Sequence, residues 1–209
     1  ASGRLRRGDE QLTGTVAVNY ARAAVPPSRS LEPTVENYQG RFRFDHFLGG
    51  GLAAFLSTTA RRDRFQGLDL RLNVDPGAAY YFLDEKAHQA WVELGYDLQF
   101  DLRNADAVAA AEAAGEPVDD SKIRHNARLY LGYQNTLSES VAFTAGLEVL
   151  QGISETDASR VNGDLALTSK IAGRFSLATT FALKYDSKPL PDVQNVDTMT
   201  AVNLVYQLL

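Results

Sequence analysis

Cysteine is absent from the sequence, which excludes a disulfide framework and thiolate metal sites. No apolar run approaches the roughly 18 residues that a membrane-spanning helix requires. No basic stripe stands out in a chain of net charge −5, so we expect no nucleic acid partner. No signal peptide is visible either. If the protein is exported, we expect the chain to be its mature form or a part of it.

What the sequence has instead is alternation of apolar and polar residues. In the clearest stretch, 66–83, Leu68, Leu70 and Leu72 alternate with Asp69 and Arg71. Similar patterns cover 90–101, 123–134 and 197–209. Successive side chains of a strand point to opposite faces of the sheet. The alternation therefore predicts an all-β chain with about 10 to 11 strands.

The connections between these strands alternate in length. Short connections are expected at 47–51, 83–88, 136–140 and 172–174, and longer ones at 24–37, 103–122, 152–160 and 186–196. Only the link near 61–65 departs from this scheme, because it is short on the side of the long connections. Short turns on one side and long loops on the other are typical of outer-membrane barrels. We therefore predict an antiparallel up-and-down transmembrane β-barrel in a single domain, 1–209.

Two segments of this domain have their own predictions. Residues 1–10 are interpreted as the tail of an N-terminal strand plus a turn at Arg7-Gly8-Asp9. Residues 104–121 are interpreted as a long extracellular loop with a short helix, which Asp106 could cap at its start and Gly115 at its end.

Alternation alone does not say which face is outside, because a soluble β-barrel or sandwich alternates as well. Three observations favour lipid on the apolar face: the length of the strands, the lack of charge between the ends of that face, and aromatics near the strand ends. The aromatics predicted at the lipid interface are Tyr20, Tyr38, Phe44, Tyr80, Phe82, Phe100, Tyr133, Phe143, Phe175, Tyr185 and Tyr206.

The opposite face is then expected to line the interior and to carry charges of both signs. These are Arg41, Arg43, Asp45, Asp69, Arg71, Asp75, Glu93, Asp97, Asp101, Arg124, Arg128, Glu148, Asp164, Lys170 and Lys184. An unpaired charge away from water is costly, so such groups would pair. The alternatives are a network that fills the barrel and a polar conduit or binding site.

The stretch 61–72, RRDRFQGLDLRL, resembles the DUF481 family of salt-induced outer-membrane proteins. Residues 93–96 and the run from 185 to 206 are similar to further parts of that family. The resemblance covers roughly 40–209 and implies a Gram-negative outer-membrane barrel without a defined activity. In that setting the C-terminus is expected to be periplasmic.

The chain departs from the family in two places. Members commonly end in a Tyr-x-Phe-like pattern, whereas this chain ends Tyr206-Gln207-Leu208-Leu209. Members also begin with one or two further strands, for which nothing before Leu12 supplies a full equivalent. The resemblance therefore implies about 12 strands in a complete barrel, of which 10 to 11 are represented here. The sequence therefore leaves open which strand pairs with 197–209 to close the barrel.

Three hypotheses describe the function. The first is a non-enzymatic outer-membrane barrel in contact with lipid, either structural or forming a narrow pore. The second is a barrel that docks a periplasmic or surface protein. The third is a lipid hydrolase that uses His125 with Ser121 and Asp119 or Asp120, although their spacing is not diagnostic. The first is preferred, so no catalytic residue, metal site or cofactor is predicted.

Overall fold

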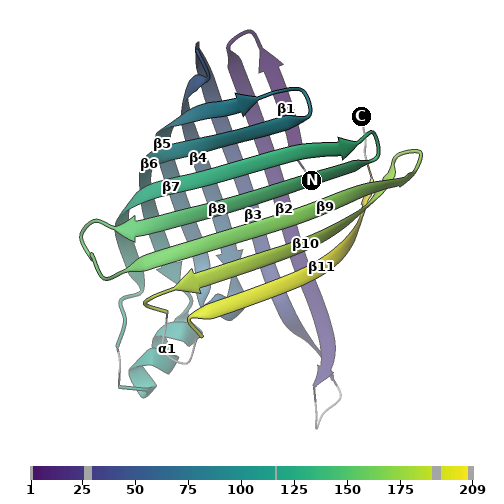
Figure 1. The fold of residues 1–209 in the computed structure, drawn as a ribbon. Helices are drawn as coiled ribbons and strands as arrows, with labels where there is room; N and C mark the ends of the chain where they lie inside the picture. Colours follow the sequence, from purple (N-terminus) through teal and green to yellow (C-terminus); the bar gives the residue numbers. More distant parts are fainter. Residues whose placement is uncertain (1, 26–29, 116, 190–193, 207–209) are drawn as a thin grey trace. The chain divides into compact units, whose positions relative to one another are not determined.

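The fold is known from a computed structural model that describes residues 2–25, 30–115, 117–189 and 194–206. In these residues each strand pairs with the next along the chain, giving one eleven-stranded sheet in the order β1 to β11. Figure 1 shows β8 to β11, coloured green to yellow, as consecutive antiparallel arrows. The all-β, up-and-down fold is thus confirmed. The strands are β1 (Ser2–Arg7), β2 (Glu10–Val25), β3 (Ser30–Gly49), β4 (Leu52–Asp63), β5 (Leu68–Asp84), β6 (His88–Arg103), β7 (Ser121–Ser138), β8 (Val141–Gly152), β9 (Ser159–Ala172), β10 (Phe175–Asp186) and β11 (Val196–Tyr206).

The register of neighbouring strands keeps apolar residues in rows on one face. Leu131 of β7 lies opposite Leu147 of β8, and the next pair along is Gly132 with Gly146. Because side chains alternate between faces, the leucines share one face and the glycines the other. The two-residue period of the sequence is therefore carried across the sheet.

The residues group into two compact units. Unit 1 comprises Ala1–Phe47, Ala54–Pro76 and Tyr96–His125. Unit 2 comprises Leu48–Ala53, Gly77–Gly95 and Asn126–Leu209. The single-domain prediction is not tested by this grouping.

The buried side chains are mostly polar, the reverse of a water-soluble core. Among the described residues, eight apolar residues are buried, and five of these are alanines. Ten polar or charged residues are buried as well, including Glu93, Asp97 and Arg128. Large apolar side chains lie exposed instead on nearly every strand, as at Val18, Leu94 and Val202.

The connections follow the predicted alternation with one exception. The turn after β3 needs glycine, because Gly49, Gly50 and Gly51 all have positive φ and a Cβ on Gly51 would lie 2.7 Å from the carbonyl oxygen of Tyr81. The predicted loop 24–37 is wrong, because β3 already begins at Ser30. Pro33 lies inside β3, next to a register shift between Ala21 and Arg22 of β2, and such an irregularity accommodates a residue without an N–H.

The N-terminal segment agrees with its prediction: β1 pairs with β2 around a turn at Gly8. The loop helix is present as α1 (Ala105–Ala113), and Gly115 follows it with positive φ. Its predicted N-cap is wrong by two positions, because Asn104 accepts the hydrogen bond from the Ala107 amide, and Asp106 lies in the first turn. No helix of the described residues is long and apolar enough to cross a membrane.

Candidate functional site

The most buried ionic group of unit 2 centres on Arg128 of β7. Its Nη1 donates to Glu93 of β6 at 2.7 Å, and its Nε donates to Glu148 of β8, also at 2.7 Å. Only 3% of the Arg128 side chain and 2% of the Glu93 side chain are exposed. Asn162 of β9 donates to the other oxygen of Glu148. One guanidinium therefore bridges carboxylates from the two strands that flank its own.

Aromatic side chains extend this group. Trp91 of β6 donates from its indole N–H to Glu93 at 3.2 Å and stacks on Tyr81, with ring centroids 5.8 Å apart. The Arg128 guanidinium lies 5.4 Å from the ring centroid of Tyr130. The Trp91 ring also lies where a Cβ of Gly132 would be, so this glycine makes room for the indole. We call Trp91, Glu93, Arg128, Tyr130 and Glu148 the Arg128 cluster.

A second ionic group belongs to unit 1. Arg71 of β5 holds Asp101 of β6 through two parallel hydrogen bonds of 2.7 and 2.8 Å. Gln99 donates to the same carboxylate at 2.7 Å. Arg103 and Arg124 lie close enough to interact electrostatically with Asp101 and with each other. We call Arg71, Asp101, Arg103 and Arg124 the Arg124 cluster.

Other residues predicted for the charged network have local partners. Arg43 pairs with Asp45 at 2.7 Å, and Arg41 donates to Ser57 at 3.0 Å. Asp97 accepts a hydrogen bond from Asn73.

The remaining members of the predicted network differ in exposure. Asp69 is exposed and pairs with Arg62 at 3.8 Å. Asp164 and Lys170 of β9 are exposed, Lys184 of β10 is half-buried, and Asp75 of β5 is buried.

Sequence reasoning missed the uncharged members of this face. Trp91, Tyr130, Gln99 and Asn73 contact the predicted charged residues but were not predicted as site residues. Each has the same strand parity as its charged neighbours, and that parity was the signal that could have identified them.

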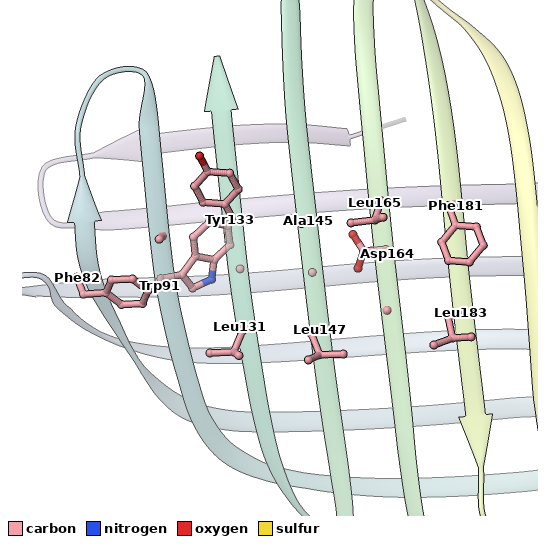
Figure 2. Close-up of a pocket in the computed structure, with 14 residues that line it drawn as sticks. Phe82, Trp91, Leu131, Tyr133, Ala145, Leu147, Asp164, Leu165, Phe181 and Leu183 are labelled. Carbon is pink, nitrogen blue, oxygen red and sulfur yellow. The ribbon is translucent and has the colours of Figure 1, made fainter. Parts of the chain in front are cut away.

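The apolar face of unit 2 carries a groove of about 550 Å³ that is lined by residues of β5 to β10. Figure 2 shows Phe82 and Trp91 at one end, Leu131 and Tyr133 next to them, and Phe181 and Leu183 at the other end. The small residues Ala145 and Gly163 lie between them in the strand register, and this leaves the hollow.

The predicted interface aromatics differ in exposure. Tyr20, Tyr38, Tyr80, Phe82, Phe175 and Tyr206 are exposed, whereas Phe44, Phe100, Tyr133, Phe143 and Tyr185 are half-buried. Phe175 and Tyr206 pair across β10 and β11 with ring centroids 5.0 Å apart. Contact of these rings with lipid stays a prediction. Gln207 and Leu208, which the closing-strand pattern included, lie outside the described residues.

His125 does not form the triad of the hydrolase hypothesis in the described structure. Its Nδ1 is hydrogen-bonded to the Tyr96 hydroxyl, and no hydrogen bond joins it to Ser121, Asp119 or Asp120 in the described part of the chain. Within the same residues, no three His, Asp or Glu side chains converge in a way that could hold a metal ion.

Fold and site together define an up-and-down antiparallel β-sheet protein with a polar buried face and an apolar exposed face. The family model described as "Protein of unknown function, DUF481" matches residues 3–208, and the chain belongs to this family. The match begins well before residue 40, where the resemblance was expected to start. No curated protein and no solved structure matches the chain.

Proposed function

We propose that the chain is a β-barrel protein of the bacterial outer membrane, with lipid against its apolar face and its charged face turned inward. One observation carries this proposal: large apolar side chains are exposed along the strands while charged ones are buried. Soluble monomers rarely expose apolar patches of this extent. A bilayer is a solvent in which this distribution is stable.

Strand length supports the same proposal. Strands β2 to β11 have 11 to 20 residues each. A tilted strand needs about 9–11 residues to cross the hydrocarbon layer, whereas strands of soluble proteins have about 5–6. Each strand from β2 onward is thus long enough to cross a bilayer.

The orientation follows from the loops. The connections after β2, β4, β6, β8 and β10 include the long segment with α1, and we place these at the cell surface. Strand β11 follows a long connection and would run toward the periplasm. We therefore propose a periplasmic C-terminus.

Within this proposal, the chain is a structural barrel or a narrow pore, without an enzymatic step. The paired charges of the Arg128 cluster support a filled interior. A guanidinium group that donates to carboxylates is not available to hydrogen-bond with water in a channel. We expect small or no discrete conductance in planar bilayers. Large, stable channels would contradict the filled interior without contradicting the barrel.

Heat modifiability tests the barrel itself. The unboiled protein from outer-membrane fractions should migrate faster on a denaturing gel than the boiled protein, because a closed barrel stays compact in detergent. Identical mobility, together with recovery in the soluble fraction, would reject the membrane proposal.

A protein partner is the second candidate. Strands β1 and β11 stand at the two ends of the described strand order, and side chains of both are largely exposed. An edge strand offers backbone groups for pairing with a further strand. A partner that copurifies at a fixed ratio, and is lost when proline replaces Thr200 of β11, would support docking at that edge. Loss of the fold in this variant is checked by its heat modifiability.

A further inference from the structure

The Arg124 cluster has more positive charge than its own carboxylate can neutralise. Its members come from β5, β6 and β7 and all belong to unit 1. Three guanidinium groups lie around the single carboxylate of Asp101, an excess of two positive charges. The loop residue Asp119 interacts electrostatically with Arg103 and lowers the excess to one.

The carboxylate of Asp101 already accepts three hydrogen bonds. Its Oδ1 accepts from Arg71 Nε, and its Oδ2 accepts from Arg71 Nη2 and from Gln99. Arg103 uses Nη1 on the backbone carbonyl of Asp119. Three of the roughly four acceptor positions of the carboxylate are therefore taken, and Arg124 uses none of these three.

Arg124 has no hydrogen bond or ion pair among the described residues. Its Nε is buried and lacks an acceptor, and its side chain is half-buried. Arg103 beside it carries the same charge, so the two repel each other. A donor that is shielded from water and unsatisfied costs about 1–3 kcal/mol, and more when charged. Such an arrangement is stabilised by an anion that accepts from both guanidinium groups.

We propose that Arg124 and Arg103, with Arg71 behind them, form a binding site for a phosphate-type oxyanion. The planar guanidinium presents two parallel donors, which match two oxygens of one phosphate. Lys122, two residues before Arg124 on the same face of β7, adds positive charge. The phosphate comes from a free ion or from a lipid headgroup, since both offer the same oxygens.

This inference goes beyond the proposed function, because an anion can bind to the folded chain without a bilayer. Its failure would leave the heat-modifiability test untouched. Likewise, a soluble protein could fail that test and still bind phosphate.

Inorganic phosphate titrated into the folded full chain in nonionic detergent at low chloride is the first probe. The ¹⁵N-detected Nε–H resonance of Arg124 should shift and saturate. Arg124→Gln should weaken binding at least about tenfold, since it removes charge-assisted hydrogen bonds. The phosphate affinity of Arg124→Lys should lie between those of the wild type and Arg124→Gln, because lysine keeps the positive charge but lacks the two parallel donors.

Arg22→Gln is the matched control, because Arg22 is an exposed arginine of β2 in the same unit and its loss alters net charge equally. Its phosphate affinity should equal that of the wild type. If Arg124→Gln does not fold, Arg103→Gln and the wild-type resonance carry the test.

Phosphatidic acid in mixed micelles, with diacylglycerol as the headgroup-free control, identifies the source of the phosphate. Saturable binding of free phosphate indicates a soluble ion. Binding of phosphatidic acid alone, without diacylglycerol binding, indicates a headgroup. The site is rejected if neither probe saturates, if acetate binds as tightly as phosphate, or if Arg124→Gln and Arg22→Gln behave alike.

Discussion

Arg128 is a buried cation that forms ion pairs with two carboxylates, Glu93 and Glu148. Both carboxylates lose their cation if Arg128 is replaced by an uncharged residue. Two carboxylates close to each other are stable as anions only with a cation between them. The loss of stability on replacing one charged residue of this face therefore depends on whether its partner stays buried as an unpaired charge.

Arg128→Met should destabilise the protein by about 3–5 kcal/mol, because it leaves Glu93 buried without its cation. Urea unfolding followed by circular dichroism measures this loss. The triple variant with Glu93→Gln and Glu148→Gln should recover most of it. A loss of only about 0.5 kcal/mol for Arg128→Met, as for a surface substitution, would contradict the statement that Glu93 stays buried without its cation.

Gly132→Ala tests the fit between backbone and indole. The added Cβ would overlap the ring of Trp91, which Tyr81 and Glu93 hold in place. Overpacking of this kind costs about 1–3 kcal/mol, measured by the same unfolding experiment. Gly40→Ala on β3 is the control, since a Cβ there meets nothing within 4 Å. Equal effects of the two substitutions would show that the indole can move aside.

At the scale of elements, strands and loops differ in what holds them. A strand inside the sheet shares its backbone hydrogen bonds with two neighbours, and the side chains of its two faces have different surroundings. A loop element such as α1 depends on its own cap and on a few polar contacts, and it can open without the sheet.

Asn104→Ala should weaken α1 by about 1 kcal/mol, because the Ala107 amide loses its 2.8 Å acceptor. Hydrogen exchange at Ala107 should be about fivefold faster, while amides of β6 stay protected. Asp106→Ala is the comparison and should have a smaller effect, since Asp106 acts only through the helix dipole. A larger effect of Asp106→Ala than of Asn104→Ala would indicate that Asp106 is the cap.

The loop pair Asp157 and Lys188 supplies a pH-dependent contact. The hydrogen bond from Lys188, at 2.6 Å, holds the pKa of the fully exposed Asp157 below its ordinary 3.8. A depressed folded-state pKa stabilises the loop above pH 3.8 and loses this effect as the pH falls below it. Lys188→Met should return the pKa of Asp157 toward 3.8 in a carboxyl NMR titration, and Lys188→Arg should not.

Substitutions at two adjacent residues of β11 test the environment of the two faces separately. Val202→Lys puts a charge on the exposed apolar face, and Asn203→Lys puts the same charge on the other. In phospholipid vesicles the first should cost about 2–4 kcal/mol and the second far less. In water both would fall within about 0.5 kcal/mol. Equal small effects in vesicles would remove the lipid assignment of that face.

At the scale of the whole molecule, strand order and turn positions could be predicted because they depend on a local two-residue period and on glycine-rich turns. The pairing of Arg71 with Asp101 could not, since it depends on the register of β5 against β6. Gly132 gave no signal because its role is the space it leaves for Trp91. The length of β3 was underestimated because Pro33 reads as a strand breaker, and a register irregularity absorbs it.

Trp91 is the single tryptophan of the chain. Its indole lies against Gly132, stacks on Tyr81 and donates to Glu93, all within unit 2. Intrinsic fluorescence excited at the tryptophan band therefore reports on the charged face of that unit alone. Circular dichroism reports on every strand. Unfolding curves that coincide by the two signals would mean that units 1 and 2 unfold as one cooperative body, and an offset between them would give each unit its own midpoint.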